Sequence, residues 1–420
     1  MTIELSGVAL LLTQVTVILI ACRALGALLR RVGQPRVVGE ILAGILLGPS
    51  LLGAALPDVQ RALFPPEGRD VLNALGQIGL VLYVFIVGLE LDVTRMKRLA
   101  REGAAVAVAG LAAPFILGAL LAWAWHDNAT LFPSGTPRTA ALLFLGAAMS
   151  ITALPVLSRI VKERGLLHDR VGVLALAAGA VSDVVAWCLL AFALAATAGQ
   201  FAGAVRTVLL TVAFAALLVF VVRPILRRLL PDTTPNSGEI PVALLATLLV
   251  CALTTELIGV HAIFGAFLLG LVTPRTERAH AVVRTLEPFT VTLLLPIFFA
   301  FSGLNTKFAS LSSPAVWWTA LVVLFVACAG KGLASFLAAR ASGLDTYTSV
   351  GVGALMNARG LVELIVLNVG LQRGLITDNL FAVMVLMAVS TTLIAGPLAS
   401  WSQGRLNRVM PGSPGSPMPP

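Results

Sequence analysis

Charged residues are scarce in this chain of 420 residues. Asp, Glu, Lys and Arg make up only 12% of it, whereas 58% of the residues are hydrophobic and the mean hydropathy is +0.96. Soluble globular domains carry about 25% charged residues. The scarcity of charge excludes an ordinary soluble enzyme, a disordered chain and a nucleic-acid-binding domain with a basic surface.

The chain also lacks the motifs of catalytic and metal centres. Its sequence contains no CxxC pair, no Cys/His cluster, no nucleophile and base pairing and no glycine-rich phosphate loop. We therefore predict neither an enzyme nor a resident cofactor. Four cysteines each lie alone in an apolar stretch, where we expect small buried apolar residues; they are Cys22, Cys188, Cys251 and Cys328.

Long apolar runs fill the sequence instead. A membrane-spanning helix needs about 20 apolar residues, so the runs predict an all-α polytopic membrane protein with about thirteen transmembrane helices. No polar linker divides the chain, which predicts one transmembrane domain over residues 1–410 and a disordered Pro/Gly/Ser tail at 411–420. The predicted spans are 7–29, 36–53, 71–91, 102–125, 139–158, 171–197, 204–224, 239–257, 259–273, 285–304, 315–339, 348–371 and 379–401.

Basic residues are distributed unevenly between the predicted loops. Twenty of the 29 Lys and Arg residues fall on one side, six on the other, and Arg23, Lys331 and Arg359 lie within spans. The positive-inside rule places the N-terminus outside and the C-terminus in the cytoplasm. The first apolar run follows the acidic Glu4 and has no small-residue cleavage site, so we expect a retained helix of a multi-pass protein in the cell inner (plasma) membrane.

Two charged residues stand out at membrane depth, where a charge at a helix centre costs about 2.5 to 3.5 kcal/mol on insertion scales. Asp183 lies mid-span, and residues 173–193 contain no other charge. This isolation favours an ion or proton pathway over a packing role. Lys331 lies nine residues before Arg340, so its amine either lines the same pathway, extends to the membrane interface or has a purely structural role.

Three further charged residues fall in or near spans. Glu363 follows Arg359 by four residues, so the two share a helix face. They form either a fixed salt bridge or a part of the ion pathway. Glu40 lies only four residues after Arg36, and we expect it to be a solvated acid at a helix end.

Two predicted spans contain helix-breaking residues. In the fifth span, Pro155 removes an amide donor, which predicts a break around Thr152 and Ala153. In the twelfth, the segment from Asn357 to Gly360 is the second predicted break. Each break adjoins a span with a mid-membrane charge, in opposite order in the two halves. This is the order expected of inverted repeats whose discontinuous helices cross at the midplane.

Several stretches give the sequence a specific resemblance. It resembles the monovalent cation:proton antiporters of the second cation:proton antiporter family, which carry a sodium/hydrogen exchanger domain, and within it the bacterial relatives of the plant cation/proton exchangers. The matching stretches, spread over about residues 36–371, are GEILAGILLGPSLLG, FIVGLELD, SITALPVLSRIVKERGLL, AVSDVVAWCLLA, LLPIFFAFSGL and MNARGLVELIVLNVGL.

The resemblance implies a homodimer in which a mobile core domain, with helices at about 102–197 and 315–401, moves against a dimerisation domain. It also implies that Asp183 binds the transported ion, and that the broken helices supply Thr152 and the stretch around Asn357. The core lysine of the family falls on Lys331. The family pattern Arg-Gly-x-x-Glu is met by Arg359, Gly360 and Glu363.

One departure from the family bears on mechanism. Electrogenic members have two adjacent aspartates, whereas here Ser182 precedes Asp183. One carboxylate holds either one proton or one monovalent cation, so we expect electroneutral exchange of Na⁺ or K⁺ for H⁺. The hydroxyls of Thr152 and Ser182 would complete the oxygen shell, and a proton carried by Lys331 would make the exchange electrogenic instead.

Two other functions compete with antiport. The buried charges could line a gated cation channel, although the sequence has no carbonyl-ring filter such as TVGYG. The chain could also be a non-transporting membrane sensor on an exchanger scaffold, because a fold does not determine a function. The presence of both Asp183 and Lys331 favours transport.

Overall fold

The computed structural model describes residues 7–198, 201–229, 242–304 and 314–409, and within these ranges it contains helices and no strand. The tail predicted to be disordered, 411–420, lies outside the described residues. The chain divides into two compact units. Unit 1 comprises Met1–Ala27, Gly39–Leu91 and Ala202–Lys307, and unit 2 comprises Leu28–Val38, Asp92–Phe201 and Phe308–Pro420.

The helices that lie wholly or mainly in unit 1 come from three separate stretches of the chain. A short π-helical segment extends α11 and another precedes α16. The elements are α1 (Gly7–Arg30), α2 (Arg36–Leu47), α3 (Leu52–Ala55), α4 (Pro57–Leu63), α5 (Pro66–Glu90), α11 (Phe201–Leu217), η1 (Leu218–Val222), α12 (Arg223–Leu229), α13 (Val242–Ile258), α14 (Ala262–Val272), α15 (Glu277–Phe289), η2 (Thr290–Leu294) and α16 (Leu295–Leu304).

Unit 2 holds the helices on which the charged residues at membrane depth lie. Two pairs of short helices, α8 with α9 and α19 with α20, each follow one another along a single predicted span. The elements are α6 (Val93–Arg98), α7 (Ala100–Trp125), α8 (Arg138–Ser150), α9 (Leu154–Glu163), α10 (Arg170–Ala198), α17 (Pro314–Ala327), η3 (Cys328–Leu333), α18 (Ala334–Ala341), α19 (Thr346–Met356), α20 (Leu361–Gln372) and α21 (Asp378–Val409).

The predicted spans reappear as helices. Among the described residues, ten helical segments are long and apolar enough to cross a membrane, and α13 and α14 are shorter apolar helices. The remaining predicted span, 348–371, is occupied by α19 and α20. The protein is therefore a multi-pass membrane protein, and the all-helical prediction is confirmed.

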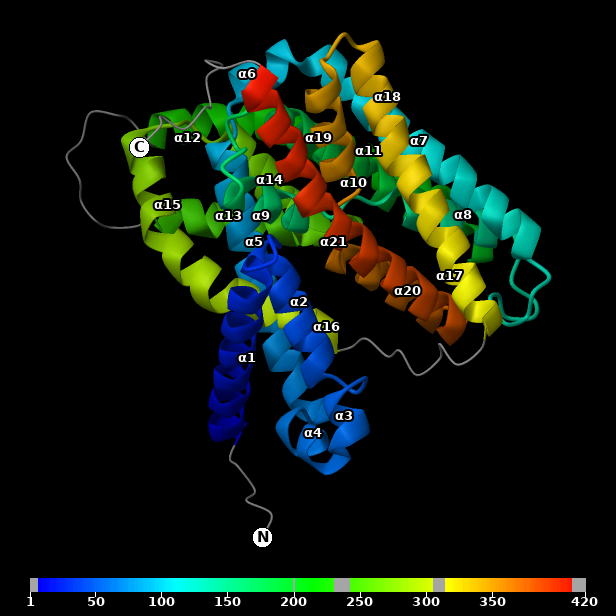
Figure 1. Ribbon diagram of the computed structural model, residues 1–420. Helices are drawn as coiled ribbons and strands as arrows, with labels where there is room; N and C mark the ends of the chain where they lie inside the picture. Colours follow the sequence, from blue (N-terminus) through cyan, green and yellow to red (C-terminus); the bar gives the residue numbers. More distant parts are fainter. Residues whose placement is uncertain (1–6, 199–200, 230–241, 305–313, 410–420) are drawn as a thin grey trace. The chain divides into compact units, whose positions relative to one another are not determined.

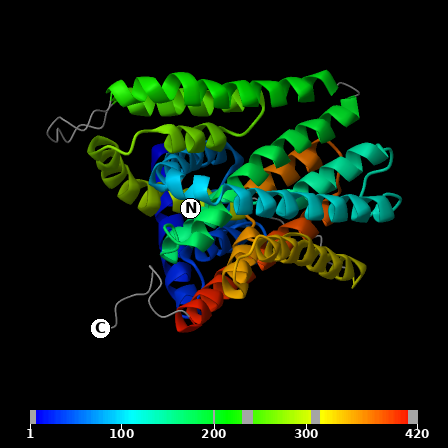
Figure 2. The same ribbon diagram turned by 90° about the horizontal axis from the view of Figure 1, so that it is seen from above.

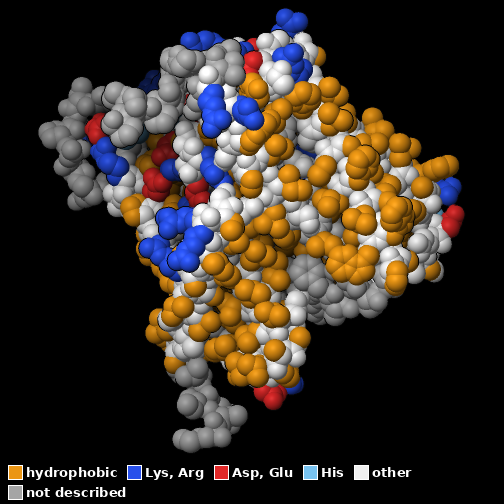
Figure 3. Space-filling model, in the orientation of Figure 1, with side chains coloured by type: hydrophobic (Ala, Val, Ile, Leu, Met, Phe, Trp, Pro, Cys, Tyr) orange, Lys and Arg blue, Asp and Glu red, His pale blue; other side chains and the backbone are white. Residues whose placement is uncertain are grey.

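The outer surface of the helices is apolar, as expected of a protein that is surrounded by lipid. Large apolar side chains are exposed on several helices, among them Leu12 on α1, Phe220 in η1 and Trp318 on α17. Figure 3 shows hydrophobic side chains over much of the visible surface, with Lys and Arg gathered at a few places. In water such an apolar surface would be unfavourable, whereas lipid tails solvate it without penalty.

Two predictions about buried residues are corrected by the structure. Glu40 is only 5% exposed and is not a solvated acid, because α1 and α2 approach one another closely within unit 1. A Cβ atom on Gly39 would lie 2.6 Å from the backbone nitrogen of Gly26. The backbones of α1 and α2 are therefore close together next to Glu40. Cys22 and Cys251 are buried as expected, whereas Cys188 and Cys328 are partly exposed.

The packing of unit 2 surrounds the paired short helices with long ones. Helices α7 and α8 lie side by side, as Figure 2 shows, and α10 packs against both. The long helix α21 (Figure 1) packs along α19 and also contacts α17 and α20. The gaps between the paired short helices are thereby buried in protein, which is where non-helical backbone is tolerated at membrane depth.

Candidate functional site: a buried charge cluster at two helix breaks

The first helix break lies between α8 and α9, at residues 151–153. Ile151 and Ala153 have non-helical backbone angles, and α9 resumes with Pro155 in its first turn. Proline fits there because its missing amide would have no intrahelical partner in the first turn. The break predicted around Thr152 and Ala153 is therefore found where the sequence placed it.

Asp183 on α10 binds the backbone amides freed by this break. Its Oδ1 accepts a hydrogen bond from the Thr152 amide at 2.8 Å, and its Oδ2 accepts one from the Leu154 amide at 3.1 Å. Asp183 and Thr152 are both fully buried. The carboxylate thus lies at the amino end of α9, where the free amides and the helix dipole favour negative charge.

The second break lies between α19 and α20, at residues 357–360, and it touches the first. The Ala153 amide donates to the Ala358 carbonyl at 3.4 Å. A Cβ atom on Gly360 would lie 2.4 Å from Cγ2 of Val156. Only glycine permits this approach of the two breaks without a shift of Val156.

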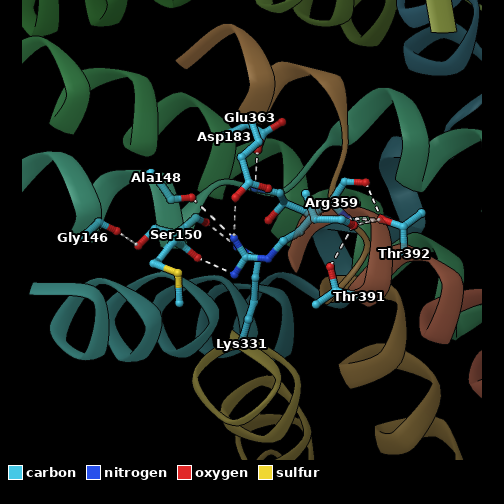
Figure 4. A network of polar contacts seen from close by, with 12 residues as sticks. Gly146, Ala148, Ser150, Asp183, Lys331, Arg359, Glu363, Thr391 and Thr392 are labelled. Atoms are coloured by element: carbon cyan, nitrogen blue, oxygen red, sulfur yellow. Dashed lines mark hydrogen bonds and ion pairs between the residues drawn. The ribbon is translucent and has the colours of Figure 1, made fainter. Parts of the chain in front are cut away.

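Two basic side chains occupy the carboxyl end of α8, as Figure 4 shows. Lys331 donates its Nζ to the Ser150 carbonyl. Arg359 donates to the Met149 carbonyl at 2.6 Å and to the Ala148 carbonyl at 3.4 Å. The last carbonyls of a helix lack intrahelical partners and carry partial negative charge, so the two cations stabilise this end.

Lys331 is fully buried, so its amine does not extend to the membrane interface. It lies in the π-helical segment η3, and such segments are frequent at functional sites. Its side chain also interacts electrostatically with Asp183, Arg359 and Glu363.

The Arg359–Glu363 pair forms the salt bridge that the spacing allowed. Arg359 Nη1 lies 3.3 Å from Glu363 Oε1, and both side chains are fully buried. Thr392 on α21 also holds the break, because the Arg359 amide donates to its hydroxyl at 3.0 Å and that hydroxyl donates to the Arg359 carbonyl at 2.5 Å. Sequence reasoning missed Thr392, although adjacent threonines in an apolar span, Thr391 and Thr392, were a visible signal.

Several buried oxygens around the breaks have no hydrogen-bond partner among the described residues. They are Thr152 Oγ1, Ser182 Oγ, Asn357 Oδ1 and Glu363 Oε2. Buried polar atoms of this kind are uncommon and call for an explanation such as an ion or water. The structure thus brings Asp183, Thr152, Lys331, Arg359 and Glu363 together. Ser182 adjoins Asp183 on α10, but its hydroxyl forms no hydrogen bond with any described residue.

No group of three or more His, Cys, Asp and Glu side chains in the described ranges could hold a tightly bound metal ion. Instead, the cluster has two acids, Asp183 and Glu363, and two bases, Lys331 and Arg359, each fully buried. Replacing one proton on one carboxylate by one monovalent cation would leave the net charge of such a cluster unchanged.

Comparisons with known proteins identify the family of the chain. Residues 16–402 match the family described as "Sodium/hydrogen exchanger, transmembrane". The chain is 38% identical over 394 residues to the Na(+)/H(+) antiporter NhaS4 of Synechocystis sp., covering 93% of this chain and 96% of that protein. It is 38% identical over 396 residues to Cation/H(+) antiporter 17 of Arabidopsis thaliana, covering 93% of this chain but only 48% of that relative, so it spans about half the relative's length.

The fold is similar to that of a solved antiporter. The sodium proton antiporter MjNhaP1 from Methanocaldococcus jannaschii matches with a TM-score of 0.66 and 15% sequence identity, covering 97% of this chain and 100% of that one. At this identity the match speaks for the fold alone. The family match across almost the whole chain and the 38% identity to NhaS4 show that the chain belongs to the sodium/hydrogen exchanger family, as the sequence stretches predicted.

Proposed function

We propose that the chain is a secondary active antiporter that exchanges a monovalent cation, Na⁺ or K⁺, for H⁺. The observation that carries this proposal is the position of Asp183, fully buried and held by the amides of Thr152 and Leu154 at a helix break. The names of the relatives, a Na(+)/H(+) antiporter and a cation/H(+) antiporter, support the same substrates.

The charge balance of the site supports exchange of one cation for one proton. With both acids ionised and both bases protonated, the four buried side chains sum to zero. Either a proton or a monovalent cation at Asp183 then adds one positive charge, whereas holding both would add two, which is costly in a medium of low dielectric constant. If the proton leaves Asp183 as the cation arrives, the net charge does not change. We therefore propose electroneutral exchange, with Asp183 as the shared site.

The free oxygens provide the remaining ligands in this proposal. Each Asp183 oxygen accepts one amide hydrogen bond and retains a lone pair for a cation. The unbonded hydroxyls of Thr152 and Ser182 and the amide oxygen of Asn357 are oxygen donors of the type that alkali cations prefer. Lys331, Arg359 and Glu363 would hold the broken helices in place around the ion.

Transport in sealed proteoliposomes tests the proposal. Addition of Na⁺ or K⁺ should release or take up protons in wild-type protein, with the membrane potential either clamped or free, and Asp183→Asn should abolish the exchange. Asp58→Asn is the matched control, since Asp58 lies on the surface with a side chain 95% exposed. A current that follows the potential without proton coupling would indicate a channel, and no flux in oriented protein would favour a sensor.

We further propose that the chain lies in the inner (plasma) membrane as a homodimer, with its N-terminus outside and its C-terminus in the cytoplasm. The excess of Lys and Arg in alternate loops supports this orientation. Labelling of a cysteine placed at Arg31 and of one placed at Arg61 tests it, since both side chains are exposed and the proposal puts them on opposite sides. Cross-linking in the native membrane tests the dimer.

A further inference from the structure

An apolar groove lies on unit 2, on a side of α10 that the charge cluster does not use. It has a volume of about 300 Å³ and runs between α7 and α10, with α6 at one end. Residues 100–108 of α7 rise about 12 Å along it. Several of its side chains are exposed, including Ala104, Val108 and Val181. Met96 on α6 and Val173 and Leu174 on α10 also line it.

Basic side chains gather at one end of this groove. On α10, Arg170 lies three and four residues before the lining residues Val173 and Leu174, on the same helix face. On α7, Arg101 lies three and seven residues before Ala104 and Val108, on the edge of the lining stripe. The short helix α6, which leads into α7 (Figure 1), adds exposed basic residues.

The charged groups at this end are only partly neutralised. Arg95 pairs with Asp92 at 3.5 Å and donates to the His168 carbonyl, and Arg170 lies 3.5 Å from Glu102. Arg98 interacts electrostatically with Asp92. Lys97 and Arg101 are exposed and form no hydrogen bond or ion pair with any described residue. The mouth of the groove, defined by Lys97, Arg98, Arg101 and Arg170, is therefore left with excess positive charge.

We propose that this groove binds one acyl chain of an anionic phospholipid, with the phosphate at the basic mouth. In a bilayer, lipid tails are as apolar as the groove, so apolar burial alone gives no preference. Shape and headgroup charge select the occupant, and basic residues near a membrane surface attract anionic lipids. Val181 and Asp183 are two residues apart and so point to opposite sides of α10; a bound chain would pack behind the helix that carries the proposed ion site.

Lipid binding to the whole protein in detergent micelles tests this site without any transport measurement, so its outcome is independent of the proposed antiport. Dioleoyl phosphatidylglycerol and dioleoyl phosphatidylcholine would be titrated and the bound lipid counted by native mass spectrometry. We expect a preference for phosphatidylglycerol. Lys97→Gln and Arg101→Gln should each weaken that binding about fivefold, since each basic residue near the surface contributes about 1 kcal/mol.

Two controls separate the groove from general surface charge. The double variant Arg227→Gln and Arg228→Gln removes two exposed charges from α12 and should leave the binding unchanged. Ala104→Trp fills the groove and should reduce bound phosphatidylglycerol, whereas Ala24→Trp, at an exposed alanine of α1, should not. Equal binding of both lipids, or equal losses in the variants and their controls, would overturn the proposal.

A photoreactive side chain identifies what occupies the groove in the membrane. With p-benzoylphenylalanine in place of Ala104, illumination should yield the chain with the mass of one phospholipid attached. Photoreactive Ala24 should yield less of this product. A cross-link from position 104 to a second copy of the chain or to another protein would show that the groove is a protein interface, and would contradict the lipid site.

Discussion

Replacing Arg359 by Met should destabilise the protein more than replacing Arg359 and Glu363 together by Met and Leu. The two side chains are fully buried with 3.3 Å between Nη1 and Oε1, so removing the guanidinium leaves Glu363 as an unpaired buried acid. Breaking a buried pair in this way costs about 3 to 5 kcal/mol, whereas apolar replacement of both partners is often close to neutral.

The double variant still loses the bonds from Arg359 to the Met149 and Ala148 carbonyls. Hydrogen bonds of charged groups contribute about 1.5 to 3 kcal/mol each, so the double variant should remain less stable than wild type. The coupling between the two sites should nevertheless be favourable by up to about 3 kcal/mol. The free energies of unfolding would come from titration with sodium dodecyl sulfate in mixed micelles.

A surface pair serves as the control for this cycle. Arg61 and Asp58 approach to 3.0 Å with side chains 73% and 95% exposed, and exposed pairs contribute little, so Arg61→Met with Asp58→Leu should show no measurable coupling. If the effects of the Arg359 and Glu363 substitutions simply add, the two residues do not stabilise one another and the reasoning is wrong.

Three further substitutions have defined outcomes in the same unfolding titration. Gly360→Ala should destabilise by about 1 to 3 kcal/mol through contact with Val156, and Val156→Ala should relieve it; a neutral Gly360→Ala would contradict the close approach of the breaks. Thr392→Val, which removes two hydrogen bonds to the Arg359 backbone, should cost about 1 to 3 kcal/mol, unlike Thr247→Val on an exposed face of α13. Asp345, which lies outside the spans, caps α19; burial raises its pKa, but hydrogen bonds from Thr348 and Tyr347 outweigh this, and the net pKa lies below its ordinary value. Asp345→Ala should therefore cost about 0.5 to 2 kcal/mol above pH 4 and progressively less as the pH falls through the lowered pKa; a cost that persists in acid would contradict this.

The helix breaks and the central acid could be predicted from the sequence because their causes are local. Proline at 155 removes an amide donor and so disfavours a continuous helix, although α7, α15 and α21 continue through Pro114, Pro288 and Pro397. An acid such as Asp183 in a long apolar run needs a partner in the protein. The Arg359–Glu363 pair is also local, because the two residues are four apart in the chain; Arg359 lies in the break and Glu363 in the first turn of α20.

The partners of these groups could not be predicted, because they lie far apart in the chain. Lys331 binds a backbone carbonyl 181 residues away. Every residue has such a carbonyl, so the residue type does not indicate which one is bound. Thr392 reaches Arg359 across 33 residues by packing of α21 against the second break. The burial of Glu40 could not be predicted for the same reason. Its distance from Arg36 along α2 does not indicate that α1 approaches α2 closely at this point.

The central claim is that cation and proton compete for Asp183. Proton release from detergent-solubilised protein in weakly buffered solution tests it most directly, with NaCl or KCl added and choline chloride as the control for ionic strength. The account predicts that each bound cation releases about one proton in wild type and none in Asp183→Asn. Cation binding without proton release, or release that persists in Asp183→Asn, would contradict it.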